Sequence, residues 1–222
     1  MLDFSDFFKK GSWPSVPLKG NGYFVSGARA CGKTSFAFQV AVNCVLDGGI
    51  ALVICTEASV HAKVPRPFVK LEDLPASALE RIQFLYVDSW ASAAHELMEL
   101  SAADEIPSFI MIDDDGFADG ADAAAPARAP PSLGSASLAL CLSCLENVGD
   151  WLARNRRPLS YAVVSNTACA DHMRRLPLPL GAFPLVHVWM GASGTVQVTP
   201  VAADDRVVEM CALRWRDGLC LA

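Results

Sequence analysis

Residues 27–34 form a glycine-containing motif that can bind the phosphates of a nucleotide. They read Gly-Ala-Arg-Ala-Cys-Gly-Lys-Thr, which fits the pattern G-x-x-x-x-G-K-T of a P-loop. In such a loop, backbone N–H groups surround a phosphate, the lysine reaches the β- and γ-phosphates, and the threonine hydroxyl ligates Mg²⁺. We therefore predict a nucleotide-binding set made of Gly27, Ala28, Arg29, Ala30, Cys31, Gly32, Lys33, Thr34 and Ser35.

Two carboxylates stand where they can complete the chemistry of this motif. Asp113 follows four apolar residues, which places it at the carboxyl end of a strand, where it can hold Mg²⁺ together with Thr34. Its neighbours Asp114 and Asp115 compete for this role, because the register can shift by one residue. Glu57 also follows an apolar run and can orient the water that attacks the γ-phosphate. Glu57 and Lys33 are the candidate catalytic residues.

The residues around the P-loop predict the elements that such a loop requires. Tyr23-Phe24-Val25 is a short apolar run typical of a strand, and residues 34–42 contain no Gly or Pro, as expected for a buried helix. In the order strand, loop, helix, the N-terminus of the helix directs its partial positive charge at the bound anion.

The rest of the chain alternates between strand and helix patterns. Further buried strands are predicted at 50–55, 82–87, 109–112 and 161–164, and helices at 90–100 and 138–153, the first with its apolar side at Ala94, Leu97, Met98 and Leu100. Residues 195–201 and 207–215 predict an antiparallel hairpin at the sheet edge. This pattern favours a single α/β domain over residues 1–222, with a mainly parallel sheet flanked by helices. Residues 114–137, rich in Ala, Asp, Pro, Gly and Ser, predict a mobile loop.

Composition and net charge limit the binding partners and the cellular location of such a domain. The chain has 222 residues, 52% of them hydrophobic, and a formal net charge of −6, so contact with nucleic acid must be local or shared with a partner. No apolar run is long enough to span a membrane, and the acidic start does not fit a signal peptide. These features predict a protein of the nucleus or cytoplasm.

Other phosphate-binding and metal-binding classes fit the residues less well. A GTPase needs an Asn-Lys-x-Asp segment, and the nearest match, Ser165-Asn166-Thr167-Ala168, lacks both charged residues. A small-molecule kinase usually has an arginine-rich lid, for which only Arg174 and Arg175 are available. The pairs Cys141/Cys144 and Cys169/His172 can in principle hold zinc, although plain packing explains them better.

Several of these segments together resemble the RecA-type recombinase ATPase core. They are the P-loop, then Val-Ile-Cys-Thr-Glu at 53–57, then 109–113, and then Ala-Val-Val-Ser-Asn at 162–166. The resemblance implies a RecA-like P-loop fold and a catalytic role for Glu57. Leu-Glu-Arg-Ile-Gln-Phe-Leu-Tyr at 79–86 and His-Glu-Leu-Met-Glu-Leu at 95–100 are similar to one branch, the small recombinase paralogues that partner a SWIM-domain protein in Shu-type complexes.

For that branch, the resemblance implies weak, DNA-stimulated ATP hydrolysis, binding of single-stranded DNA, and a nuclear role in homologous recombination with a SWIM-domain partner and other recombinase paralogues. The chain departs from the family in lacking an N-terminal DNA-binding domain and in placing Thr167 where the family has a glutamine. Of the two loops expected to meet DNA, only 168–183 is basic, through Arg174 and Arg175. The departures and the negative charge favour one alternative, a nucleotide-stabilised scaffold that binds proteins, with acidic loops and residues such as Trp13 or Trp189 as contacts. A metabolite kinase is a third, less favoured alternative.

Overall fold

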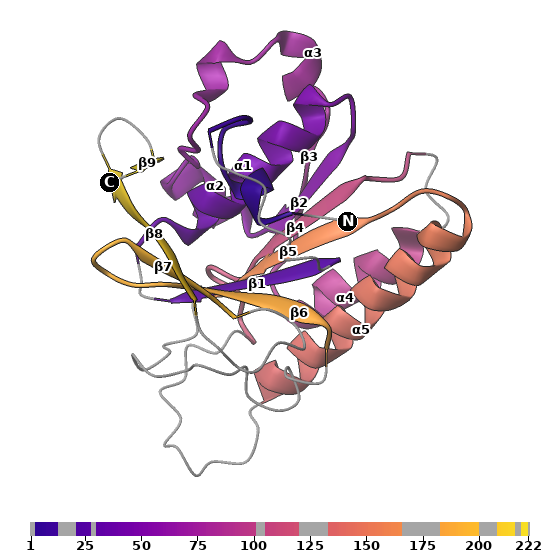
Figure 1. Cartoon of the computed structure of the whole chain (residues 1–222). Coiled ribbons are helices and arrows are strands. Elements are labelled where there is room, and N and C mark those ends of the chain that lie inside the picture. Colours follow the sequence, from indigo (N-terminus) through magenta and orange to yellow (C-terminus); the bar gives the residue numbers. More distant parts are fainter. Residues whose placement is uncertain are drawn as a thin grey trace.

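A single mixed sheet with helices on both faces organises the chain (Figure 1). The computed structural model describes residues 3–12, 21–27, 30–100, 105–119, 133–165, 183–199, 208–215 and 219–221. The strands are β1 (Gly22–Gly27), β2 (Ala51–Cys55), β3 (Ile82–Tyr86), β4 (Phe109–Asp113), β5 (Ser160–Val164), β6 (Leu185–Met190), β7 (Thr195–Thr199), β8 (Val208–Trp215) and β9 (Leu219–Leu221). The helices are α1 (Lys33–Leu46), α2 (Glu57–Ala62), α3 (Ala76–Leu79), α4 (Trp90–Glu99) and α5 (Leu133–Arg154), with the 3₁₀ helices η1 (Phe4–Phe7) and η2 (Leu71–Asp73).

The strand order is β3-β2-β4-β5-β1-β6-β7-β8-β9. All pairs from β3 to β6 are parallel, and the pairs β6–β7, β7–β8 and β8–β9 are antiparallel. The predicted α/β class, the mainly parallel sheet and the C-terminal hairpin are therefore confirmed. Because parallel strands end at the same edge, the loops after β1, β2, β4 and β5 meet there.

The sheet separates two apolar cores, and the side chains of each strand alternate between them. On one face, α1 and η1 cover Tyr23 and Val25 of β1, and on the other face α4 and α5 cover Phe24. Figure 1 shows α4 and α5 side by side on their face, away from α1. The middle strands are buried on both faces, which explains their unbroken apolar sequences.

The N-terminal segment adds an aromatic layer to the α1 face that the sequence patterns did not indicate. Phe4, Phe7 and Phe8 are buried and surround the ring of Phe36, with centroid distances of 6.1, 4.9 and 5.4 Å. The Asn43 amide donates to the carbonyl oxygens of Asp6 and Phe8, both at 2.8 Å. This segment therefore holds the helix that follows the P-loop.

Several boundaries and exposures differ from the sequence predictions. The strand at β3 lies at the sheet edge, so Phe84 and Tyr86 are 38% and 46% exposed instead of buried. Met98, assigned to the apolar side of α4, is 55% exposed. Helix α5 begins at Leu133, so residues 133–137 of the predicted mobile loop are helical, because extending a packed helix costs little per residue. Residues 120–132 of that loop lie outside the described residues.

Strand β6 has no counterpart in the sequence prediction, although it lies in the middle of the sheet between β1 and β7. Its His187 interrupts the apolar run and conceals the strand pattern. Trp189, considered above as a partner contact, is only partly exposed, and Trp13 is outside the described residues.

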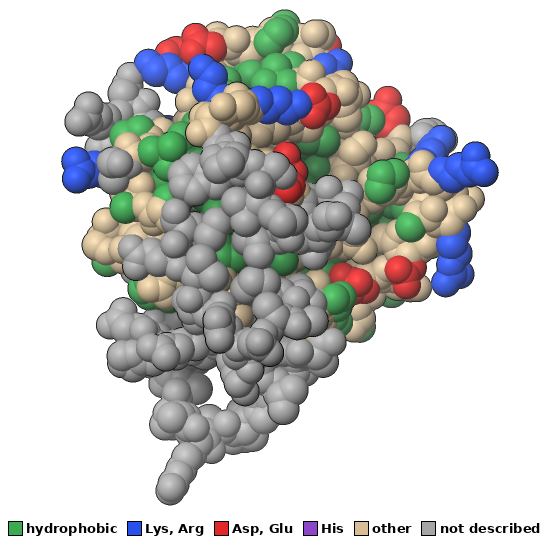
Figure 2. All heavy atoms as spheres, viewed as in Figure 1, with side chains coloured by type: hydrophobic (Ala, Val, Ile, Leu, Met, Phe, Trp, Pro, Cys, Tyr) green, Lys and Arg blue, Asp and Glu red, His purple; other side chains and the backbone are tan. Residues whose placement is uncertain are grey.

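Charged side chains of both signs lie on the described part of the face that Figure 2 shows. On the face seen in Figure 2, the Lys and Arg side chains of the described residues form small separate groups with Asp and Glu between them. Of the helices that the structure describes, none combines the length and apolar composition needed to cross a bilayer.

His187 predicts how stability depends on pH. Its Nε2 lies 2.8 Å from Ser26 Oγ in the buried β1–β6 pair, and burial lowers its pKa to about 4. Because the unfolded imidazole titrates near 6.5, the stability that neutral His187 provides is complete above that pH and is lost as pH falls toward 4. The free energy of unfolding should fall with a contribution of up to about 1.4 kcal/mol per pH unit from this proton. Urea titrations across this range should give a shallower decline for His187→Gln; equal slopes would contradict the assignment.

Candidate nucleotide and magnesium site

The P-loop lies between β1 and α1, as the motif requires. Gly27 ends β1 with φ +135°, and a Cβ there would lie 2.0 Å from the carbonyl oxygen of Met190, so only glycine fits. Gly32 caps α1 with φ +95°, and Ala30 has φ +57°. The loop thus reverses direction and presents the N-terminus of a 14-residue helix. Ala28 and Arg29 lie outside the described residues.

Lys33 points back over the loop. Its side chain is buried, with the residue 4% exposed, and its Nζ donates to the carbonyl oxygen of Gly27 at 3.2 Å. A lysine that reaches across the loop from the first turn of α1 stands at the place where the motif holds the β- and γ-phosphates.

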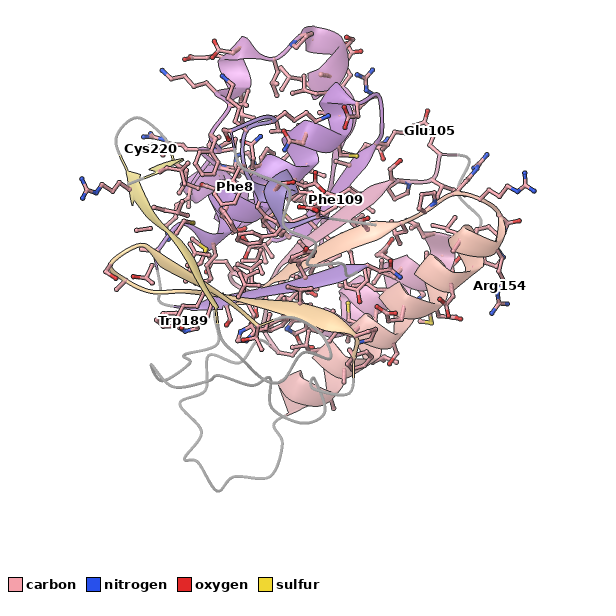
Figure 3. The ribbon with its side chains drawn as sticks, in the orientation of Figure 1. Phe8, Glu105, Phe109, Arg154, Trp189 and Cys220 are labelled. Carbon is pink, nitrogen blue, oxygen red and sulfur yellow. The ribbon has the colours of Figure 1, made fainter. Side chains whose placement is uncertain are left out.

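Thr34 and Asp113 come together although β1 and β4 are not neighbours. Strand β5 lies between them, which separates β1 from β4 by roughly 10 Å. Thr34 lies in the first turn of α1, and its Oγ1 donates to Asp113 Oδ2 at 2.6 Å. The backbone N–H of Asp115 donates to the other carboxylate oxygen at 3.2 Å. Phe109, labelled in Figure 3, begins β4 and is buried like Asp113 at the other end, so the whole strand lies in the interior.

The environment of Asp113 fits a cation. The residue is 3% exposed, and burial raises the pKa of its carboxyl, while the hydrogen bonds from Thr34 and Asp115 act in the opposite direction. A buried carboxylate of this kind is stabilised by a nearby positive charge. A hydroxyl and a carboxylate are oxygen ligands that Mg²⁺ accepts when phosphates and water fill its other positions.

The structure also separates the three consecutive aspartates. Asp114 turns to the opposite face of the sheet and accepts a hydrogen bond from Ser165 Oγ at 2.6 Å. Asp115 lies beside the site, where its N–H contacts Asp113. The hydrogen bond from Thr34 goes to Asp113, the residue that the sequence analysis proposed for the metal; its binding of Mg²⁺ stays a prediction.

A cleft of about 590 Å³ opens beside this pair. Its polar part includes Lys33, Thr34, Asp113 and Asp115, and its apolar wall includes Phe38, Val53, Met111 and Phe84. This volume is in the range of small-molecule sites. The P-loop, β2, β4 and the segment after β2 therefore enclose one space.

Glu57 does not reach this cleft. It is the first residue of α2, its side chain is 68% exposed, and its Oε1 lies 3.6 Å from Nε2 of His61 in the next turn. The structure thus brings Lys33, Thr34 and Asp113 together and leaves Glu57 outside the cleft.

Three basic residues at the rim of the cleft were missed by the sequence analysis: His61, Lys63 and Arg66. Arg66 lies next to the P-loop helix because its backbone N–H donates to Ser35 Oγ at 2.9 Å. Pro65 and Pro67 on either side hint at an extended segment, but nothing in the sequence indicates that it returns to α1.

Other candidates are buried or lie outside the described residues. Cys31 is buried, and burial raises the pKa of its thiol. Cys141 is fully buried in the α5 core, and the part of the chain that the structure describes contains no group of three or more His, Cys, Asp or Glu side chains arranged to hold a metal. Cys169, His172, Asn166, Thr167, Arg174 and Arg175 fall in segments that the structure does not describe.

Replacing Asp113 should weaken Mg²⁺-ATP binding without destabilising the ligand-free protein. Asp113→Asn removes a carboxylate whose burial opposes ionisation, so without ligand the variant should melt at the same temperature as the wild type or higher. With Mg²⁺ and ATP at 100 times the wild-type Kd, the wild type should gain about 2.7 kcal/mol and the variant much less. Thermal shift assays with and without Mg²⁺-ATP measure both effects, with exposed Asp73→Asn as the control. An equal ligand-induced shift in both variants would remove Asp113 from the site.

No protein-family model matches the chain, and no curated protein matches it. What the residues can do therefore has to be argued from their own geometry.

Proposed function

We propose that this protein is a Mg²⁺-dependent ATPase of the recombinase-paralogue type. The observation that carries the proposal is the 2.6 Å hydrogen bond between Thr34 and Asp113, next to a glycine-bounded loop and a buried lysine. Lys33 and Thr34 begin α1, which follows β1, whereas Asp113 ends β4, a distant part of the sequence and a strand that is not adjacent to β1. Their convergence at a helix N-terminus supports phosphate and magnesium binding more strongly than the sequence motif alone.

Each residue then has a definite part in hydrolysis. The N–H groups of the P-loop and Lys33 bind the phosphates, and Thr34 and Asp113 hold Mg²⁺, which neutralises charge on the phosphate oxygens. Water attacks the γ-phosphorus, the bond to the β–γ bridging oxygen breaks, and ADP and inorganic phosphate leave. Glu57 would orient this water and accept its proton, but only after its side chain turns from its exposed position toward the cleft.

The wider role follows from the resemblance of the sequence to recombinase paralogues. We propose that the protein acts in homologous recombination in the nucleus, together with a SWIM-domain partner and other recombinase paralogues, on single-stranded DNA. The mainly parallel sheet with antiparallel C-terminal strands supports the RecA-like P-loop assignment. Direct DNA contact would come from Arg174 and Arg175.

The outward position of Glu57 favours a second candidate. If Glu57 stays exposed, the protein would bind nucleotide without hydrolysing it and would serve as a scaffold whose main ligand is another protein. The net charge of −6 and the scattered basic side chains on the face in Figure 2 agree with this reading. Turnover measurements separate the two candidates.

Replacing Lys33 tests nucleotide binding. Lys33→Ala removes charge-assisted hydrogen bonds to phosphate, each of which contributes about 1.5–3 kcal/mol, so ATP affinity should fall by about 100-fold or more. Calorimetric titration with Mg²⁺-ATP measures the affinity, circular dichroism checks the fold, and exposed Lys9→Ala is the matched control. ATP binding of wild-type strength by a folded Lys33→Ala protein would refute the P-loop function.

Replacing Glu57 tests hydrolysis. Glu57→Gln keeps the size of the side chain but removes the proton acceptor, so ATP affinity should stay within about threefold while kcat falls by about 100-fold. Phosphate release with and without single-stranded DNA gives kcat, and exposed Glu99→Gln controls for the lost charge. A measurable wild-type rate that Glu57→Gln leaves unchanged would exclude Glu57 from the reaction. If the wild type binds ATP but shows no turnover, the scaffold function is the better description.

A further inference from the structure

We propose that Thr56 is a positioning residue that couples the magnesium site to the orientation of α2 and therefore of Glu57. This inference rests on the proposed function, because it concerns how the same site becomes complete. Lys33, Thr34 and Asp113 are assembled at the cleft, whereas the side chain of Glu57 is 68% exposed and lies outside the cleft.

A continuous chain of hydrogen bonds joins the two places. Thr34 Oγ1 donates to Asp113 Oδ2 at 2.6 Å, and the N–H of Asp115 donates to Asp113 Oδ1 at 3.2 Å. Thr56 Oγ1 then donates to the carbonyl oxygen of Asp115 at 2.9 Å. Thr56 Oγ1 also accepts a hydrogen bond from the N–H of Ser59 at 3.2 Å and so caps α2. Three hydrogen bonds and the backbone of Asp115, which joins its N–H to its carbonyl through Cα, therefore connect Thr34 with the helix that carries Glu57.

The turn after β4 is shaped to receive the Thr56 side chain. Gly116 has φ +88°, and a Cβ at this position would lie 3.1 Å from Thr56 Oγ1. The absence of a side chain at 116 lets the backbone approach the hydroxyl closely enough for the bond to Asp115. Because the turn and the Thr56 hydroxyl are in close contact, a displacement of the turn would also displace Thr56.

Helix α2 is attached weakly enough to respond. None of its six residues, all of which the structure describes, is buried. Isolated helices of this length are not stable by themselves, so the cap at Thr56 and the few contacts of Val60 with the core hold it. The cleft next to α2 has an apolar wall that includes Phe38 and Phe84, and Val60 lines the same space. A small change at the N-terminus of α2 is thus sufficient to favour a second orientation in which Glu57 faces the site.

The coupling follows from the chemistry of Asp113. When Mg²⁺ binds, the carboxylate oxygens of Asp113 are drawn toward the ion, and the bond from the Asp115 N–H must adjust. A shift of the Asp115 N–H would pass through the Cα of Asp115 to its carbonyl, which accepts from Thr56. The residues Asp113, Asp115 and Thr56 would thereby link an occupied cation site to the populations of the two α2 orientations.

Two variants distinguish this role from simple capping. Thr56→Val keeps the shape of the side chain and removes both hydrogen bonds, whereas Thr56→Ser keeps the hydroxyl. Ser89→Ala removes the corresponding cap of α4, whose Oγ accepts the N–H of Ser92 at 3.1 Å, and so controls for the loss of a cap far from the P-loop. Both cap losses should lower the melting temperature by a similar amount.

The test combines hydrogen exchange with kinetics on the whole chain. In the wild type, Mg²⁺ with a non-hydrolysable ATP analogue should change amide exchange in residues 57–62, and the change should be at least threefold smaller in Thr56→Val. The kcat of Thr56→Val should fall by about 10- to 100-fold, with ATP affinity within threefold of the wild type. Thr56→Ser and Ser89→Ala should behave like the wild type in both measurements.

The possible failures are distinguishable. If the wild type binds the analogue but exchange in residues 57–62 does not change, the coupling is wrong and the ATPase proposal stands. The coupling is also wrong if Thr56→Val responds like the wild type, or if Ser89→Ala lowers kcat as much as Thr56→Val does. If the wild type binds no nucleotide, both the coupling and the proposed function fail.

Discussion

The buried carboxylate of Asp113 is the constraint on which the site depends. It lies at the end of an apolar strand, where ionisation is opposed by burial, and it is held by Thr34 and by the N–H of Asp115. These partners come from the first turn of α1 and from the turn after β4, in which Gly116 has a φ of +88°. Burial makes the ionised form of this carboxyl unfavourable, and a cation bound next to it would offset that cost.

The surrounding architecture serves this arrangement. Six parallel strands direct their carboxyl ends to one edge, and two apolar cores make the sheet rigid. The aromatic N-terminal segment packs on Phe36 and fixes the helix whose first turn carries Lys33 and Thr34. The antiparallel strands β7 to β9 extend the sheet beyond β6, and the N–H of Leu219 donates to the carbonyl oxygen of Arg66 at 3.3 Å, beside the cleft.

The elements that carry the candidate site residues differ in how firmly they are packed. Lys33, Thr34 and Asp113 belong to elements that are buried, so their geometry is present before a ligand binds. Glu57 belongs to a short helix without buried residues, and its side chain faces solvent. In the proposed ATPase, nucleotide would bind to groups that are already assembled, and hydrolysis would require a further movement of Glu57.

The sequence by itself determined the local features: the P-loop, the strand and helix around it, Asp113 at a strand end, and the α/β class. These follow from glycine spacing and from apolar runs, whose physical causes act within a few residues. Only the tertiary structure decided that β3 is an edge strand, that β6 lies beside β1 despite His187, that Asp114 faces away, and that Arg66 returns to the cleft. It also decided that Glu57 lies outside the assembled site. Strand order and side-chain direction depend on contacts between residues far apart in the chain, which no local pattern encodes.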